Sequence, residues 1–475
     1  WETLAAIAMV ITAIFLLPKY LKGGLTTVPG FLAKRFDVTT KTLTSGLFLS
    51  GYVIVLLPVI LYSGSLAISG MFNVPELLGV THKQSIWICV WGIGIIGSIY
   101  AVFGGLKAVA ISDSINAIGL LIGGILIPIF GLMMIGEDGS IMDGLSVLIT
   151  ENPEKFKSMG SATDPVPFYT IFTGMILVQL FYWGTNQQII QRALGAKNLK
   201  EGQKGLLLAS FIKILGPIIV VLPGLIAFHL FQGNLESADS AYPELVRKVL
   251  PEAWVGFFAA VLFGAILSSF NSVLNSSVTL FGIDIYKQHI NKDADEKTVV
   301  KYGKMFGIVL AIAAMFIAPL IANAGSLFDY LQEINGIYSI PILTIIVVGY
   351  LTKRVPAIAA KIGLVSGCLL YIISQFFMQP YFINSALENA KTAGITDTAQ
   401  LAIIEAQAYP HFLDIMAILF LSNIAIMLLI GKCYPRKEAY VQEYTKQVDI
   451  TSWKYTKLVG IAICVIVVGV YVYFA

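Results

Sequence analysis

Apolar runs that are long enough to cross a lipid bilayer recur along the whole chain, separated by shorter polar segments. A membrane-spanning α-helix needs about 20 apolar residues, whereas a membrane β-strand would alternate apolar and polar positions. The runs are continuous and lack this alternation, so they predict helices. We expect about twelve spans, at residues 1–18, 43–70, 86–103, 109–135, 168–191, 203–231, 255–285, 298–322, 327–351, 357–381, 411–431 and 457–475.

The composition fits a protein that uses lipid as its solvent. Hydrophobic residues make up 57% of the 475 and charged residues only 12%, about half the charged share of a soluble domain. Backbone groups find no water to bond in hydrocarbon, so the chain is expected to be an all-α integral membrane protein. We treat residues 1–475 as a single transmembrane domain.

Features of several other protein classes are not recognisable in the sequence. The four cysteines and four histidines show no metal or redox spacing, and there is no nucleotide-binding loop or catalytic triad. The sequence therefore predicts a protein that is not an enzyme, does not bind nucleic acid and has the lipid bilayer as a partner. It leaves the oligomeric state open.

The distribution of basic residues predicts the orientation in the membrane. If the first span ends in the cytoplasm, 24 of the 31 Lys and Arg residues lie on the cytoplasmic side and only 6 on the outer side. Cytoplasmic loops carry such an excess, and the bias persists through all the expected spans. We predict a multi-pass protein of the inner (plasma) membrane.

One lysine lies deep inside an apolar run. Lys213, in ASFIKILGPIIVVLPG (209–224), lies about ten residues from either Lys204 or the pair Pro223-Gly224, at a depth where a charge costs roughly 2.5–3.5 kcal/mol on membrane-insertion scales. Snorkelling to an interface is one explanation, and an ion-pair partner such as Glu2 is the one we favour. A neutral pair suits a neutral, hydroxyl-rich solute, because hydroxyls donate to a carboxylate and accept from an ammonium group.

Hydroxyl and amide side chains are concentrated in AILSSFNSVLNSS (265–277). Small residues at helix interfaces explain such a run in many membrane proteins. The alternative is a site for a hard cation, in which the hydroxyls of Ser268 and Ser269 bind Na⁺. Hydroxyls do not titrate near neutrality, which favours Na⁺ over a proton as the coupling ion.

Two further segments combine aromatic and polar residues. In QLFYWGTNQQIIQR (179–192), Gly184 is either a packing glycine or the site of a helix break, and Tyr182 and Trp183 offer flat faces for a sugar ring. In SLFDYLQEINGIYSIP (326–341), Phe328 and Gln332 are four residues apart and share a helix face.

Four segments, in the right order, resemble the sodium–solute symporters, and within them the sodium/galactose and sodium/glucose branch. They are YWGTNQQIIQRAL (182–194), GGLKAVAISDSIN (104–116), AILSSFNSVLNSSVTLFGIDIYK (265–287) and FDYLQEI (328–334). The resemblance implies a LeuT-type bundle of two inverted five-helix repeats with additional helices. It also implies that the chain, which opens at Trp1 without an initiator Met, lacks the first two helices of the family.

The resemblance implies roles for individual residues. Substrate contacts are expected from Glu2, Gln179, Tyr182, Trp183, Lys213 and Gln332. Trp1 and Phe328 are expected as outer gates and Tyr182 as the inner gate. A sodium site is expected at Ala265 (through its carbonyl), Ser268 and Ser269, and Asp113 is expected on the sodium path.

This chain departs from the family pattern at two substrate positions. Gln179 stands where the galactose symporter has asparagine, and Ala5 stands where a serine helps to hold the sugar. The absent first core helix also carries part of the sodium site in the family.

These features predict a sodium-coupled symporter of a neutral galactose- or glucose-type hexose that works by alternating access. The first alternative substrate is myo-inositol or another polyol. The second is an organic acid such as sialate, which the neutral set of Glu2, Lys213 and Gln332 disfavours. A sensor or channel without coupled transport is a further alternative. A sensor is expected to carry a long soluble extension and a channel a continuous polar path, and neither is evident in the sequence.

Overall fold

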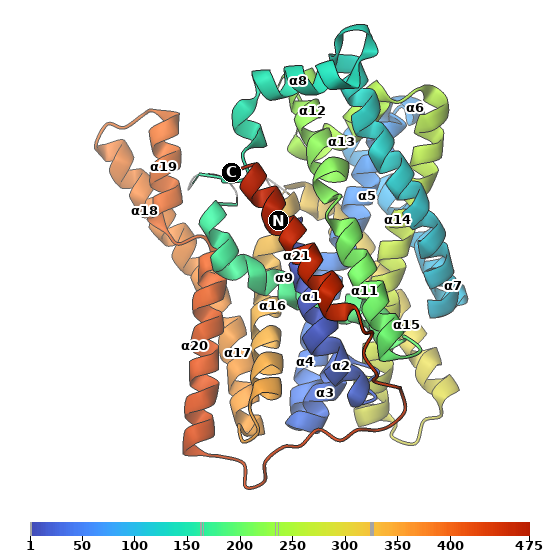
Figure 1. Ribbon diagram of the computed structural model, residues 1–475, viewed down its shortest axis with the longest axis vertical. Coiled ribbons are helices and arrows are strands. Elements are labelled where there is room, and N and C mark those ends of the chain that lie inside the picture. Colours follow the sequence, from blue (N-terminus) through green and yellow to red (C-terminus); the bar gives the residue numbers. More distant parts are fainter. Residues whose placement is uncertain (1, 162–163, 165, 233, 236, 324–326) are drawn as a thin grey trace. The chain divides into compact units, whose positions relative to one another are not determined.

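The computed structural model describes residues 2–161, 164, 166–232, 234–235, 237–323 and 327–475 (Figure 1). All the regular secondary structure of these residues is helical. The predicted all-α architecture is therefore confirmed.

Ten helices in the described part of the chain are long and apolar enough to cross a membrane. They coincide with ten of the twelve predicted spans. The other two predicted spans are interrupted: Leu199–Lys213 and Pro217–Phe231 make up an eleventh if they are joined, and Gly174–Gly184 is an apolar helix of less than full length. Both interruptions fall at residues that concern the site.

The described chain forms two compact units. Unit 1 comprises residues 1–48, 157–213 and 332–475, and unit 2 comprises 49–156 and 214–331. The helices that lie mainly in unit 1 are α1 (Leu4–Ile11), α2 (Leu17–Lys22), α3 (Val28–Arg35), α4 (Val38–Gly51), α9 (Gly174–Gly184), α10 (Gln187–Leu194), α11 (Leu199–Lys213), α16 (Leu327–Leu351), α17 (Ala357–Ile373), α18 (Gln379–Thr392), α19 (Thr398–Ala408), α20 (Phe412–Cys433) and α21 (Thr456–Tyr473).

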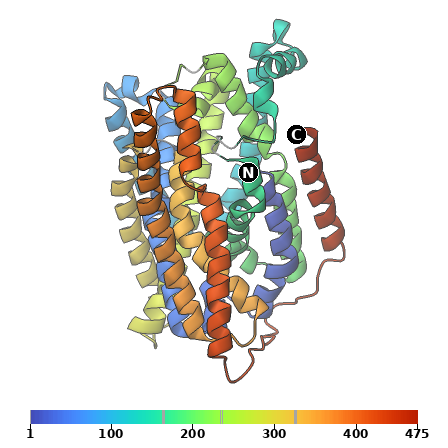
Figure 2. The same ribbon diagram turned by 90° about the vertical axis from the view of Figure 1, so that its left-hand side faces the viewer.

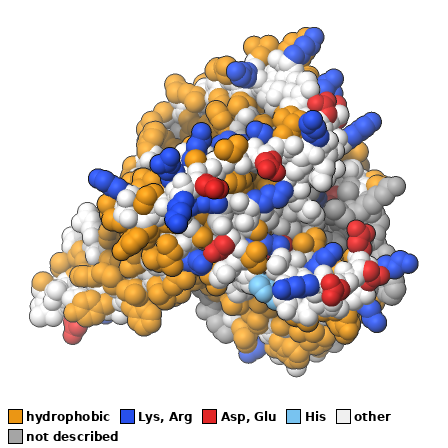
Figure 3. All heavy atoms as spheres, turned by 90° about the horizontal axis from the view of Figure 1, so that it is seen from below, with side chains coloured by type: hydrophobic (Ala, Val, Ile, Leu, Met, Phe, Trp, Pro, Cys, Tyr) orange, Lys and Arg blue, Asp and Glu red, His pale blue; other side chains and the backbone are white. Residues whose placement is uncertain are grey.

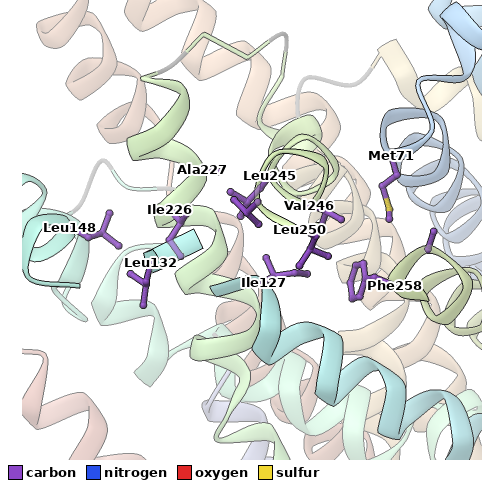
Figure 4. Close-up of a cluster of buried hydrophobic side chains, with 12 residues drawn as sticks. Met71, Ile127, Leu132, Leu148, Ile226, Ala227, Leu245, Val246, Leu250 and Phe258 are labelled. Atoms are coloured by element: carbon purple, nitrogen blue, oxygen red, sulfur yellow. The ribbon is translucent and has the colours of Figure 1, made fainter. Parts of the chain in front are cut away.

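Unit 2 is built around α7, which contains two apolar stretches, His82–Ala101 and Ile111–Ile135. Its helices are α5 (Leu57–Met71), α6 (Val74–Leu78), α7 (His82–Ile135), α8 (Ile141–Glu151), α12 (Leu222–Phe231), α13 (Ala241–Val249), α14 (Glu252–Thr279) and α15 (Glu296–Ile317). Figure 4 shows one of its cores, in which Ile127, Ile226 and Phe258 are buried together.

In unit 1, α1 packs against α9, α11 and α21 (Figures 1 and 2). A buried core connects α1, α9, α16 and α20, with Leu4, Val178, Ile340 and Met416 among its members. These four helices therefore form a common scaffold for the polar residues near the start of α1.

Four π-helical turns each precede a proline by two residues. Proline lacks the N–H that would bond the carbonyl four residues earlier, and its ring crowds that carbonyl, so a widened turn relieves the conflict. The turns and their prolines are Thr12–Leu16 with Pro18, Tyr52–Leu56 with Pro58, Pro217–Val221 with Pro223, and Ser374–Met378 with Pro380.

A buried arginine joins α3 to the end of α16 in unit 1. Arg35 is fully buried; its Nε donates to the Gly349 carbonyl at 2.9 Å and its Nη1 to the Val355 carbonyl at 3.1 Å. Its Nη2 donates to both the carbonyl and the hydroxyl of Thr352. The loops that follow α3 and α16 are among those predicted to be cytoplasmic, and Figure 3 shows Lys and Arg side chains on the face seen from below.

Candidate functional site

Lys213 and Glu2 form an ion pair. The lysine is the last residue of α11, and the glutamate lies two residues before α1 begins. The partner that the sequence predicted for Lys213 is therefore the one observed. The two side chains are 29% and 28% exposed, so they are open to a molecule that approaches them.

A buried hydrogen bond aligns the two helices that carry this pair. The Ser210 hydroxyl on α11 donates to the Ala6 carbonyl on α1 at 2.8 Å. Ser210 lies three residues before Lys213 and Ala6 lies four after Glu2, so the bond is about one helical turn from the ion pair. No role was predicted for Ser210 from the sequence, although its spacing from Lys213 puts both residues on one face of α11.

An indole ring continues the polar cluster. The Lys213 ammonium nitrogen is 5.9 Å from the centre of the Trp183 ring, within range of a cation–π interaction. The Trp183 Nε1–H donates to Gln179 Oε1 at 3.2 Å, and Gln179 is only 4% exposed. Glu2, Lys213, Trp183 and Gln179 thus form a connected series within unit 1.

The tyrosine predicted as the inner gate lies next to this series. The rings of Tyr182 and Trp183 are 5.1 Å apart and nearly perpendicular, and Tyr182 is half-buried. Gln332 is 8% exposed and lies about two turns before the core residue Ile340 on α16. Phe328 lies one turn before Gln332 and is 38% exposed. Trp1 lies outside the described residues.

Helix breaks position the cluster. Helix α9 ends at Gly184, where the Thr185 hydroxyl caps the Phe181 carbonyl at 2.9 Å, and Asn186 begins α10 by accepting from the Gln188 N–H at 3.0 Å. The open Gly184 carbonyl accepts from Tyr20 at 3.0 Å. Of the two interpretations of Gly184, the helix break is confirmed, although the glycine also packs against Thr12 and Leu16.

A second break follows Lys213, and we did not predict it. Helix α11 ends at Lys213, and the π-helical turn begins at Pro217 after Gly216. Proline disfavours the helical conformation in the residue before it, so the Gly216–Pro217 pair was the signal for this break. Because the carbonyl end of a helix is its negative pole, the break leaves the Lys213 ammonium where a cation is stabilised.

The residues predicted to bind sodium share one face of α14 in unit 2. Ala265, Ser268 and Ser269 follow the helical spacing of three and four residues. Within the described chain the two serine hydroxyls make no hydrogen bonds, whereas the Ser268 carbonyl accepts from Ser272 at 2.6 Å. Two free hydroxyl oxygens fit a hard monovalent cation, because such ions take neutral oxygen ligands.

Asp113 is half-buried on the second apolar stretch of α7. The nearby Asn116 side chain lies against Gly264, the residue before Ala265. The part of α7 that carries Asp113 therefore packs against the part of α14 that carries the predicted sodium ligands.

Comparisons with known proteins agree with this fold. The solved structure of a Na⁺-coupled sialic acid symporter in a substrate-bound outward-open state aligns with a TM-score of 0.64 at 20% identity, covering 88% of this chain and 84% of that one. The likeness shows that the protein has the LeuT-type fold expected from the sequence. It defines the class as an all-α membrane protein with this helical architecture.

The family model for the sodium:solute symporter family matches residues 1–367. The chain belongs to the sodium:solute symporter family. It is a multi-pass membrane transporter and not an enzyme, and Na⁺ is its coupling ion.

Several relatives cover most of this chain. The "Uncharacterized symporter YidK" of Escherichia coli (strain K12) is 43% identical over 472 residues, which is 99% of this chain and 77% of the relative. The sodium/glucose cotransporter of Vibrio parahaemolyticus is 32% identical over 79% of this chain and 71% of its own length. The human sodium/myo-inositol cotransporter 2 is 28% identical over 80% of this chain and 60% of its own length.

Proposed function

We propose that the protein carries a neutral galactose- or glucose-type hexose together with Na⁺ across the inner (plasma) membrane by alternating access. The Lys213–Glu2 ion pair is the single observation that carries the proposal. The sodium/glucose cotransporter of Vibrio parahaemolyticus, at 32% identity, supports the choice of substrate class.

The charge of the proposed substrate site favours a neutral solute. The ammonium and the carboxylate cancel, so an anionic substrate would have to compete with Glu2 for Lys213. A sugar hydroxyl instead accepts from the ammonium group and donates to the carboxylate at the same time. We propose that Glu2 and Lys213 hold adjacent hydroxyls in this way.

The neighbouring side chains supply further sugar contacts in this proposal. Gln179 and Gln332 each offer an amide that both donates and accepts, and Trp183 presents an aromatic face beside the charged pair. Aromatic faces suit the apolar C–H surface of a sugar ring. Tyr182 closes the site toward the cytoplasm, and Phe328, together with Trp1, closes it toward the outside.

Sodium supplies the driving force. We propose that Ala265 (through its carbonyl), Ser268 and Ser269 bind the ion and that Asp113 lies on its path to the cytoplasm. An ion shifts the balance between outward-open and inward-open states only by the difference in its affinity for the two. Sodium therefore has to bind more tightly to the outward-open state, in which the sugar enters.

A polyol is the second candidate substrate. Ala5, which is 1% exposed, lacks the hydroxyl expected at a sugar-contacting position, so the site differs from that of a hexose symporter near Glu2. Myo-inositol has hydroxyls all around its ring and can use the same ion pair. The human sodium/myo-inositol cotransporter 2 is similar over 80% of this chain.

Competition for uptake tests the proposal. Full-length protein in vesicles with an inward sodium gradient should accumulate labelled galactose, and unlabelled glucose should compete more strongly than myo-inositol. Stronger competition by myo-inositol would replace the hexose with a polyol. Competition by sialate or pyruvate, with none by the sugars, would refute the claim that the Lys213–Glu2 pair selects a neutral solute.

A further inference from the structure

An apolar groove of about 450 Å³ runs between α1 and α21 in unit 1. We call it the α1–α21 groove. Its lining is aliphatic and aromatic apart from one thiol, and consists of Val10, Ile11, Ile14, Phe15, Gly460, Ile461, Cys464, Val465 and Val468. Both helices are membrane spans, so the groove lies at the depth of the lipid chains.

The two walls meet at a close contact. The side chains of Val10 and Ile14 lie against Gly460, where α21 has no side chain. Elsewhere in the lining, Phe15 and Val465 are 60% and 65% exposed. Large apolar side chains exposed on both walls leave room for a flexible hydrocarbon chain.

A lysine continues the groove face of α21 toward its start. Lys457 lies three residues before Gly460, four before Ile461 and seven before Cys464, which is the spacing of one helix face. It is exposed, as is Lys454, and the rings of Trp453 and Tyr455, the two residues that flank Lys454 in the sequence, are 5.6 Å apart. Basic and aromatic residues together are typical of the membrane interface, and the basic bias assigns this end to the cytoplasm.

We propose that the α1–α21 groove binds an acyl chain of an anionic phospholipid of the cytoplasmic leaflet, with the lipid phosphate near Lys457. The apolar walls account for the chain, and each buried methylene adds to the binding. The lysine accounts for the preference for an anionic headgroup, since juxtamembrane basic residues attract acidic lipids. The groove is separate from the proposed substrate and sodium residues.

Native mass spectrometry of delipidated full-length protein tests the proposal. The probes are phosphatidylglycerol and phosphatidylcholine with the same palmitoyl and oleoyl chains. We expect phosphatidylglycerol to bind about fivefold more tightly, the effect of one basic residue near an anionic headgroup. Lys457→Gln should abolish this preference, whereas Lys437→Gln, at an exposed lysine of the segment between α20 and α21, should keep it.

A groove-filling variant tests the acyl chain. Val465→Trp should weaken phosphatidylglycerol binding by about tenfold, the effect of losing roughly two buried methylene groups. Ile466→Trp is the matched control, because Ile466 is 44% exposed on the same helix and lies outside the groove. Equal binding by the two variants would overturn the proposal.

Cross-linking with a phosphatidylglycerol that carries a diazirine on its acyl chain locates the bound lipid. Label at residues 10–15 and 461–468 supports the proposal. Label elsewhere overturns it.

Discussion

Lys213 and Glu2 are charged groups in apolar surroundings, and each lowers the cost of burying the other. Removing one partner of such a pair leaves an uncompensated charge, which costs more than the pair itself contributes. Partial exposure of both side chains keeps the pair accessible to a substrate. The same interaction can therefore stabilise α1 against α11 and present a donor and an acceptor to a sugar.

The proposed sodium ligands give a prediction for a single residue. Ser269→Ala should raise the sodium concentration for half-maximal uptake by about tenfold, because a contact between a hydroxyl and a charged partner contributes roughly 1.5 kcal/mol or more. The measurement is uptake by full-length protein against sodium concentration. Ser63→Ala is the control, since the Ser63 hydroxyl bonds the Ile60 carbonyl of its own helix. An unchanged sodium dependence in Ser269→Ala would refute the site.

At the scale of helices and loops, Arg35 holds α3 against the end of α16. Burial and the neighbouring Arg436 lower the pKa of Arg35 to about 10, so the guanidinium group stays charged at neutral pH. Its N–H groups donate hydrogen bonds to the backbone carbonyls of Gly349, Thr352 and Val355. Loss of this side chain would leave several buried acceptors without partners.

Arg35→Ala should lower the free energy of unfolding by about 3 kcal/mol or more, since each unsatisfied buried acceptor costs roughly 1–3 kcal/mol. Thermal unfolding of the protein in detergent measures the effect. Arg354→Ala, at an exposed arginine of the loop after α16, should change the stability by less than about 0.5 kcal/mol. A similar loss in both variants would contradict the importance of the buried contacts.

The loop after α3 contains a pH-dependent contact. Burial favours a raised pKa for Asp37, but hydrogen bonds from Lys361 (at 2.7 Å) and Thr40 outweigh it, so the pKa lies below its usual value of 3.8. A lowered pKa means that the contact stabilises the fold fully above the unfolded pKa and is lost as pH falls through the folded one.

The stability difference between wild type and Asp37→Asn should therefore shrink as the pH falls from about 6 to about 3. Melting temperatures in detergent across this range measure it. Asp293→Asn, in the exposed loop before α15, is the control and should track the wild type. A difference that is constant with pH would show that the Asp37 carboxylate contributes nothing through its charge.

Much of this element structure could be predicted from the sequence. Continuous apolar runs predicted the spans, whereas the sequence left Gly184 open between a packing glycine and a helix break, and only the structure shows that α9 ends there. The break after Lys213 was missed because the run stays apolar across Gly216 and Pro217. The Arg35 contacts could not be predicted, since their partners are more than 300 residues away.

For the whole molecule, coupling requires one ion and one solute to act on the same conformational equilibrium. The proposed sodium ligands on α14 belong to unit 2, whereas Glu2, Lys213 and Gln332 belong to unit 1. The two sets of residues that we propose for ion and sugar are thus divided between the units.

The most direct test of the account is sodium-driven uptake of labelled galactose by full-length protein in vesicles, compared between Lys213→Ala and Lys204→Ala. Both lysines are on α11, but Lys204 makes an exposed pair with Glu201. We predict that Lys213→Ala lowers the rate of uptake at least about 100-fold, which corresponds to a loss of roughly 2.7 kcal/mol in interaction free energy. Lys204→Ala should transport as the wild type does. Equal uptake by Lys213→Ala and the wild type, with equal insertion in the membrane, would contradict the claim that this ammonium group binds the substrate.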